Sequence, residues 1–285
     1  MRFALLFATV VGISTLCACA GRNDDRGYRL IPAPADAIAV SASGDGMLAL
    51  VGGNDSDRNV TLESASDGTV IRRFGVTREA DSIAVGRDGR IYLGLTTVAG
   101  GAIEEWSAQG RKLRVIPAPA AVVALASSPA GTWAFVRDRA ALVAFEIPSS
   151  GARLSRSVPL PAGTTSLAYC EGMGEPSLIV SERDEHVTLV RIRDAATTDT
   201  TNVGRAPVCS KPSAAIYALT RAGGASYLSV IAMQTLLAVK QTPTMHDAVA
   251  LATDPGGDLI VLGKGPRATA IGIYARAARD LQVRV

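Results

Sequence analysis

Three aspartates occupy equivalent positions before three apolar segments of the chain. Asp36, Asp81 and Asp247 each stand two residues before the first aliphatic side chain of a short run of small apolar residues. If the fold brings these runs together, the carboxylates gather at one place, with Glu79 and His246 beside them. Like charges so placed favour a cation, a basic peptide or a polar ligand. The alternative is that each aspartate caps its own strand by accepting hydrogen bonds from backbone N–H groups.

A second candidate site lies in the polar segment from Asp55 to Glu63. Asp55, Asp57, Asn59 and Glu63 offer oxygen ligands at odd-numbered positions, in a pattern that resembles the calcium loop D-x-D-x-[DN]-G-x-x-[DE]. Val60 stands where that pattern has glycine. Calcium is the only cofactor that the sequence suggests, and the alternative is a solvated polar loop.

The usual catalytic signatures are missing from the sequence. It contains no G-x-S-x-G, H-E-x-x-H, P-loop or C-x-x-C motif, and its only histidines are His186 and His246. We therefore predict no catalytic residue. Aromatic residues make up 5% of the chain and the formal net charge is +3, which argues against a nucleic-acid partner because neither stacking platforms nor a basic footprint is evident.

The elements that must position these residues come from an internal repeat. The stretch YRLIPAPADAIAV from Tyr28 has a near-copy, LRVIPAPAAVVAL, 85 residues further on, which is two periods of about 42. Six apolar runs open the copies at Ala37, Ser82, Val122, Ser166, Ala215 and Ala248. Each is followed by a glycine-bearing turn, at Gly46, Gly89, Gly131, Gly174, Gly224 and Gly257, and then by a second strand.

The repeat predicts an all-β fold, a six-bladed β-propeller. Four short strands per period, joined by Gly, Pro and Asp turns, are typical of a propeller blade. In the fifth copy, Ala215–Leu219 is predicted as the innermost strand and Tyr227–Ile231 as the second. Tyr28–Ile31 matches a fourth strand and is predicted to close the ring by completing the last blade, although Leu281–Val285 could take the same place. Asp36, Asp81 and Asp247 then fall on consecutive blades.

Runs such as IAVGRDGRIYL from Ile83 and VALATDPGGDLIV from Val249 resemble the repeats of NHL, SMP-30-like and YVTN propellers. These families include lactonases, lyases and proteins that only bind. The SMP-30-like hydrolases hold a divalent metal through Glu and Asn/Asp side chains of inner strands, and the corresponding strands here offer no such group. The resemblance leaves a metal-dependent hydrolase or lyase as the alternative to a binding propeller.

The first residues predict export. Residues 1–18 read as a signal peptide, and Leu16-Cys17-Ala18-Cys19 resembles the lipobox of bacterial lipoproteins, which implies that Cys19 is acylated after cleavage. A site releasing a soluble secreted protein and an uncleaved anchor are alternatives. Residues 19–27 read as a linker, of which residues 20–27 reach at most about 28 Å, and residues 28–285 as the propeller. In an oxidising compartment, Cys170 and Cys209 are predicted to form a disulfide, with two free thiols as the alternative.

Together these features predict an envelope protein held to the membrane by a lipid. Its partner is expected to be another envelope protein or a small ligand, bound at the loop face of the propeller.

Overall fold

The computed structural model describes residues 28–54, 57–77, 79–86, 88–97, 100–137, 142–148, 154–171, 174–264 and 268–275. The predicted signal peptide, Cys19 and the linker lie outside these residues. All regular elements within the described ranges are strands. None of the described segments forms a helix long and apolar enough to span a membrane.

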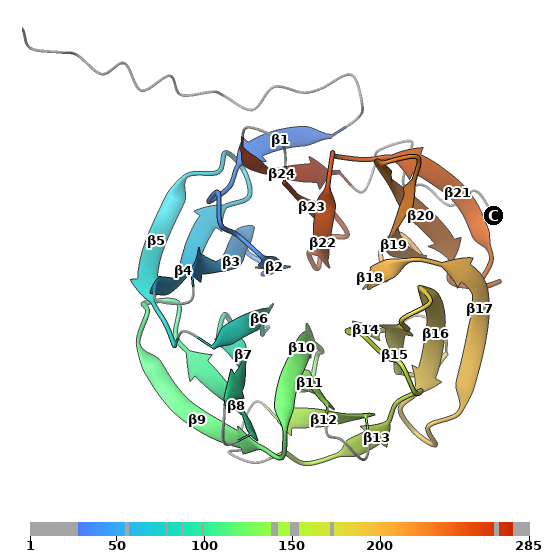
Figure 1. Ribbon diagram of the computed structural model, residues 1–285, viewed down its shortest axis with the longest axis horizontal. Helices are drawn as coiled ribbons and strands as arrows, with labels where there is room; N and C mark the ends of the chain where they lie inside the picture. Colours follow the sequence, from blue (N-terminus) through green and yellow to red (C-terminus); the bar gives the residue numbers. More distant parts are fainter. Residues whose placement is uncertain are drawn as a thin grey trace, which may run out of the picture.

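In the described part of the chain, twenty-four strands form six four-stranded antiparallel sheets arranged as the blades of a ring (Figure 1). Blade 1 contains β2 (Ala39–Ala42), β3 (Met47–Asn54), β4 (Asp57–Ser64) and β5 (Val70–Gly75). Blade 2 contains β6 (Ala80–Val85), β7 (Ile91–Thr97), β8 (Gly100–Trp106) and β9 (Lys112–Ala118). Blade 3 contains β10 (Ala121–Ser127), β11 (Gly131–Arg137), β12 (Leu142–Pro148) and β13 (Ser157–Pro159). The six-bladed propeller predicted from the repeat is confirmed.

The other three blades complete the ring. Blade 4 contains β14 (Ser166–Cys170), β15 (Ser177–Ser181), β16 (His186–Arg191) and β17 (Thr197–Val203). Blade 5 contains β18 (Arg205–Ser210), β19 (Ala215–Ala222), β20 (Ala225–Ala232) and β21 (Ala238–Pro243). Blade 6 contains β22 (Ala248–Thr253), β23 (Leu259–Lys264), β24 (Thr269–Tyr274) and the N-terminal strand β1 (Arg29–Pro32).

The N-terminal strand closes the ring, as predicted. β1 pairs antiparallel with β24, with Arg29 opposite Ile273 and Pro32 opposite Ala270. Ile31 is buried beneath this pairing, and Arg29 donates hydrogen bonds to the backbone carbonyls of Ala65 and Ser66 in blade 1. The other predicted closing strand, Leu281–Val285, lies outside the described residues.

Each blade is apolar on both faces because it packs against two neighbours. Along β3, Ala49 and Val51 belong to the core shared with blade 2, whereas Leu48 and Leu50 belong to the core shared with blade 6. Successive side chains of a strand point to opposite faces, so an unbroken apolar run supplies both cores. This packing explains why the strands read as continuous hydrophobic segments.

The prediction for blade 5 was wrong by one strand. Ala215–Leu219 lies in β19, the second strand, and Tyr227–Ile231 lies in β20, the third. The innermost strand is β18, which contains Pro207 at an irregularity of its pairing. Its turn to β19 has no glycine, and Ala214 adopts a φ of 48° there. Gly224 therefore belongs to the next turn.

Candidate functional site

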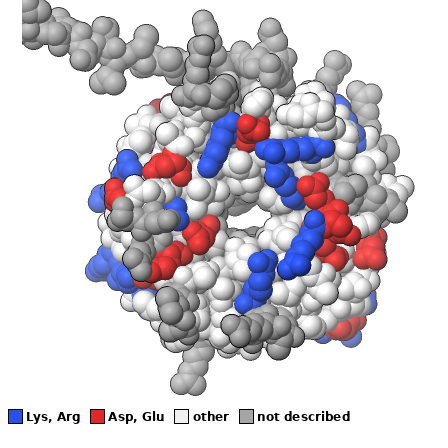
Figure 2. Space-filling model, in the orientation of Figure 1, with Lys and Arg blue, Asp and Glu red and all other residues white. Residues whose placement is uncertain are grey.

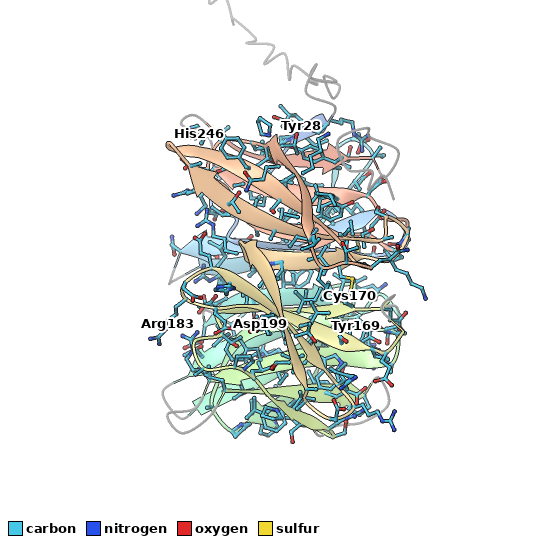
Figure 3. All side chains as sticks on the ribbon, turned by 90° about the vertical axis from the view of Figure 1, so that its right-hand side faces the viewer. Tyr28, Tyr169, Cys170, Arg183, Asp199 and His246 are labelled. Atoms are coloured by element: carbon cyan, nitrogen blue, oxygen red, sulfur yellow. A yellow bond between two sulfur atoms is a disulfide. The ribbon has the colours of Figure 1, made fainter. Side chains whose placement is uncertain are left out.

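The inner strands of the six blades surround a central channel. It encloses a cavity of about 300 Å³ lined mainly by small side chains, such as Ala39, Ala124, Ser166 and Ala250. The innermost strands run in the same direction, so all begin at one face of the ring. Figure 3 shows the ring from its edge, with His246 and Arg183 at that face and Cys170 and Tyr169 toward the other. We call the face where the inner strands begin the entry face.

The three predicted aspartates lie on the entry face, in consecutive blades. Asp36 precedes β2, Asp81 lies in β6 and Asp247 precedes β22, and β2 contacts both β6 and β22. Asp36 and Asp81 are exposed. The structure therefore places the three carboxylates on the same part of the channel opening, where Asp81 also lines the cavity.

Arginines from the preceding blades neutralise two of these aspartates. Nη2 of Arg58 lies 3.0 Å from Oδ1 of Asp81, and Nη2 of Arg221 lies 2.9 Å from Oδ1 of Asp247. His246 is exposed, and its Nδ1 lies 3.0 Å from Oδ2 of Asp247. Asp247 adopts a φ of 47°, and its carbonyl accepts a hydrogen bond from Lys264 N–H. The opening is therefore a site of paired charges.

Further arginines at the entry face reach across blade junctions. Arg137 of blade 3 donates to the carbonyl of Thr164, and Arg205 of blade 5 donates to the carbonyl of Ala248. Figure 2 views the entry face and shows both basic and acidic side chains around the channel opening. Of these arginines, Arg58, Arg205 and Arg221 were not singled out in the sequence. They stand next to glycine, aspartate or strand ends, without a shared spacing that would single them out.

Glu79 lies beside Asp81, just before β6. It is half-buried, and its backbone carbonyl accepts a hydrogen bond from Thr96 N–H at 3.4 Å. It is thus placed near the group of acidic residues with which the sequence analysis associated it.

The predicted calcium ligands are located differently from expectation. Asp55 lies outside the described residues, and Asp57, Asn59 and Glu63 lie in strand β4 rather than in a loop. At about 3.3 Å per residue, the extended backbone separates Asp57 from Glu63 by about 20 Å, so these two cannot surround one ion. Within the described ranges, no group of three or more His, Cys, Asp or Glu residues is placed to hold a metal.

Asn59 and Glu63 instead belong to the junction between blades 1 and 6. Asn59 Oδ1 accepts hydrogen bonds from Arg73 Nε at 3.0 Å and from Thr61 Oγ1 at 3.4 Å. Glu63 is only 2% exposed and pairs with Leu48, whose side chain packs against blade 6. Burial raises the pKa of Glu63 to about 7, and its Oε2 atom makes no hydrogen bond with the described residues.

Cys170 and Cys209 form the predicted disulfide, which links β14 of blade 4 to β18 of blade 5. Cys209 also lines the channel. The bond therefore joins two inner strands at the end opposite to the entry face.

The opposite face has its own depression, of about 240 Å³. Tyr169 donates to Glu171 Oε1 at 2.9 Å, and Lys211 Nζ lies 3.6 Å from Glu171 Oε2. Asp254 also lines this depression, and burial raises the pKa of its carboxyl. These residues were not evident from the sequence, because they follow the inner strands in turns of varied length.

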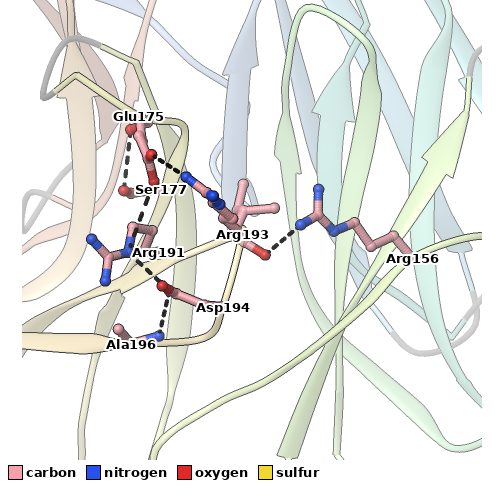
Figure 4. A network of polar contacts seen from close by, with 8 residues as sticks. Arg156, Glu175, Ser177, Arg191, Arg193, Asp194 and Ala196 are labelled. Atoms are coloured by element: carbon pink, nitrogen blue, oxygen red, sulfur yellow. Dashed lines mark hydrogen bonds and ion pairs between the residues drawn. The ribbon is translucent and has the colours of Figure 1, made fainter.

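A polar network joins blades 3 and 4 on this opposite face (Figure 4). Arg156 donates to the carbonyl of Ile192 at 2.7 Å. Arg191 forms an ion pair with Asp194 at 2.8 Å, and Glu175 accepts a hydrogen bond from Arg193 at 3.2 Å. These exposed contacts shape the turn after β16.

Comparisons with known proteins agree with the fold. No protein-family model and no curated protein matches the chain. Among solved structures, a chain of hydrazine synthase from Kuenenia stuttgartiensis matches with a TM-score of 0.61 and 12% sequence identity, over 85% of this chain and 84% of that one. At this identity the similarity shows the six-bladed propeller fold alone. The resemblance to NHL, SMP-30-like and YVTN repeats is thus supported as far as that fold.

Proposed function

We propose that this protein is a lipid-anchored propeller of the cell envelope that binds an envelope protein or a small ligand through its entry face. The ion pairs Arg58–Asp81 and Arg221–Asp247 carry the proposal, because each holds a positive and a negative group at a defined position beside the channel. Their carboxylate side chains remain 52% and 42% exposed. Charge patterns of this kind select partners and orient them.

The size of the channel supports recognition at its opening. A cavity of about 300 Å³ is at the lower end of the range for small-molecule sites, and its walls combine small apolar side chains with Ser, Thr and Asp81 side chains. A partner protein would contact the charged opening and the loops around it. Only a narrow part of a small ligand would fit into the channel, and the rest would remain at the opening.

Site-specific photocrosslinking in intact cells tests the binding face. A photoreactive residue in place of Arg183, on the entry face, should yield a defined crosslinked product. The same residue in place of Lys211, on the opposite face, is the matched control and should not. The product should diminish when Asp81 and Asp247 are both changed to Asn. A product of equal yield from both positions would contradict the assignment of the face.

A separate measurement tests the lipid anchor. The intact mass of the protein from the membrane fraction should correspond to a chain that begins at an acylated Cys19. A soluble, unacylated chain would support the secreted alternative instead. This result is independent of which face binds the partner.

A further inference from the structure

The outer rim of blades 1 and 2 carries an unusual group of exposed apolar side chains. Val70 and Ile71 of β5 are each 56% exposed, and Leu113 and Val115 of β9 are 39% and 51% exposed. Of the described residues, only Leu237 and Val239 in blade 5 are large hydrophobics with comparable exposure. Exposed apolar groups gathered on one part of a surface mark contact sites for proteins or membranes.

Basic residues alternate with these apolar ones. The segments VIRRFG (residues 70–75) and RKLRVI (residues 111–116) contain five Arg or Lys and no acidic residue. Buried Glu104 and Glu105 form ion pairs with Lys112 and Arg114. Counting these two carboxylates, the two segments keep a formal charge of +3. That equals the net charge of the whole chain. The surface formed by residues 70–75 and 111–116 is called the basic rim below.

Aromatic contacts between blades 1 and 2 connect the two halves of the basic rim. Phe74 stacks on Trp106 with ring centroids 5.5 Å apart, and Lys112 Nζ lies 5.2 Å from the centroid of the Trp106 ring. Trp106 Nε1 in turn donates to Glu104 Oε2 at 3.0 Å. In Figure 1, β5 and β9 follow one another along the left-hand rim, and Figure 2 shows basic side chains on that edge.

The first described residues of the chain lie beside this rim. Arg29, at the start of β1, donates to the carbonyl of Ser66, and Val70 follows only four residues later, at most about 14 Å away. Residues 20–27 span at most about 28 Å. A lipid on Cys19 would therefore hold this side of the ring close to the bilayer.

We propose that the basic rim docks on the surface of an anionic phospholipid membrane. At the boundary between headgroups and acyl chains, the apolar side chains can contact the acyl chains and the basic side chains can bind the anionic headgroups. The inference rests on the proposed lipid anchor, but it makes a separate claim about which surface faces the membrane.

Hydroxyl-radical footprinting of the intact protein, followed by peptide mass spectrometry, tests this orientation. The protein is labelled in vesicles containing about 30% phosphatidylglycerol, in pure phosphatidylcholine vesicles and in detergent. We expect at least threefold lower labelling of residues 70–75 and 111–116 in the anionic vesicles than in detergent. Residues 237–240, with the exposed Leu237 and Val239, are the internal control and should label equally in both.

A charge variant provides the second test. Arg72→Ser with Arg111→Ser removes two exposed cations whose side chains the structure does not place in the core. At roughly fivefold per basic residue, an unacylated chain should lose about 25-fold in affinity for the anionic vesicles. Unchanged labelling of the basic rim in a protein shown by mass to be acylated would overturn the docking proposal while leaving the anchor intact. If the natural protein proves by mass to be unacylated, protection of its basic rim by anionic vesicles would support docking and refute the anchor.

Discussion

Arg58 and Asp81 form an ion pair across the junction between blades 1 and 2, with 3.0 Å between Nη2 and Oδ1. Arg58 is 10% exposed and also donates to the carbonyl of Gly53, whereas Asp81 is 52% exposed. The two partners should therefore contribute unequally to stability.

We expect Asp81→Asn to lower the free energy of unfolding by about 0.5 kcal/mol, as is usual for exposed ion pairs. Arg58→Ala should cost about 1–2 kcal/mol, because it also removes the buried stem of the side chain and a hydrogen bond. Urea denaturation of both single variants and of the double variant forms a double-mutant cycle, which measures the interaction energy between Arg58 and Asp81. A loss above 2 kcal/mol for Asp81→Asn would contradict this assignment.

Glu63 should make stability depend on pH. Its pKa is raised to about 7 by burial, so the folded protein retains this proton at pH values where the unfolded chain, with a pKa near 4.5, has lost it. The stability that Glu63 contributes through this proton is complete below about pH 4.5 and is lost as the pH rises to about 7. The upper limit of the loss is about 3 kcal/mol.

Glu63→Gln should remove this dependence, because the amide stays neutral at all these pH values. Urea denaturation at several pH values between 4.5 and 8 measures it. The free energy of unfolding of the variant should rise relative to that of the natural protein as the pH rises. Parallel curves for the two proteins would show that Glu63 does not titrate in this range.

The disulfide between Cys170 and Cys209 should contribute about 4 kcal/mol, since it closes a loop of 39 residues. We expect the double variant Cys170→Ala, Cys209→Ala to melt about 10 °C lower. Reduction of the natural protein should have the same effect. The corresponding check is thiol counting in unreduced, denatured protein, where labelling of both cysteines would refute the bond.

Among the residues of β1, Ile31 should contribute most to stability through apolar burial. It is 2% exposed and packs with Leu262 and Ile271 in the core between blades 6 and 1. Ile31→Ala should cost about 3 kcal/mol, within the usual range for buried aliphatic residues. Leu30→Ala, at a half-buried position in the same strand, is the matched control and should cost clearly less in thermal or urea unfolding. Equal losses would argue against the register of β1.

The repeat predicted the ring because each blade meets the same physical requirement. Apolar residues must face both neighbours, and a tight turn must follow the inner strand, so Gly46, Gly89, Gly174 and Gly257 recur with positive φ. The prediction failed for β18 because that strand contains Pro207 and its turn uses Ala214 in place of glycine. A pattern based on glycine then selected the next hairpin.

The candidate site was predictable only in part. The position of an aspartate before an inner strand follows from the repeat, so the shared face of Asp36, Asp81 and Asp247 could be inferred. Arg58 and Arg221 come from other strands of the preceding blades, and their approach to the aspartates depends on how neighbouring blades pack. The alternation of Asp57, Asn59 and Glu63 indicated a loop of ligands, but a strand with one polar face has the same period of two.

The pairing of β1 with β24 has a consequence for biosynthesis. Arg29 lies opposite Ile273, so β1 is synthesised long before its partner β24 and cannot pair until β24 has been made. Such distant partners slow folding, because a long stretch of chain must be brought together before the contact forms. Five sheets are complete within their own stretch of polypeptide, and the sixth is not. We therefore expect the newly made protein to pass through an open arc, which becomes a circle only after β24 has been synthesised.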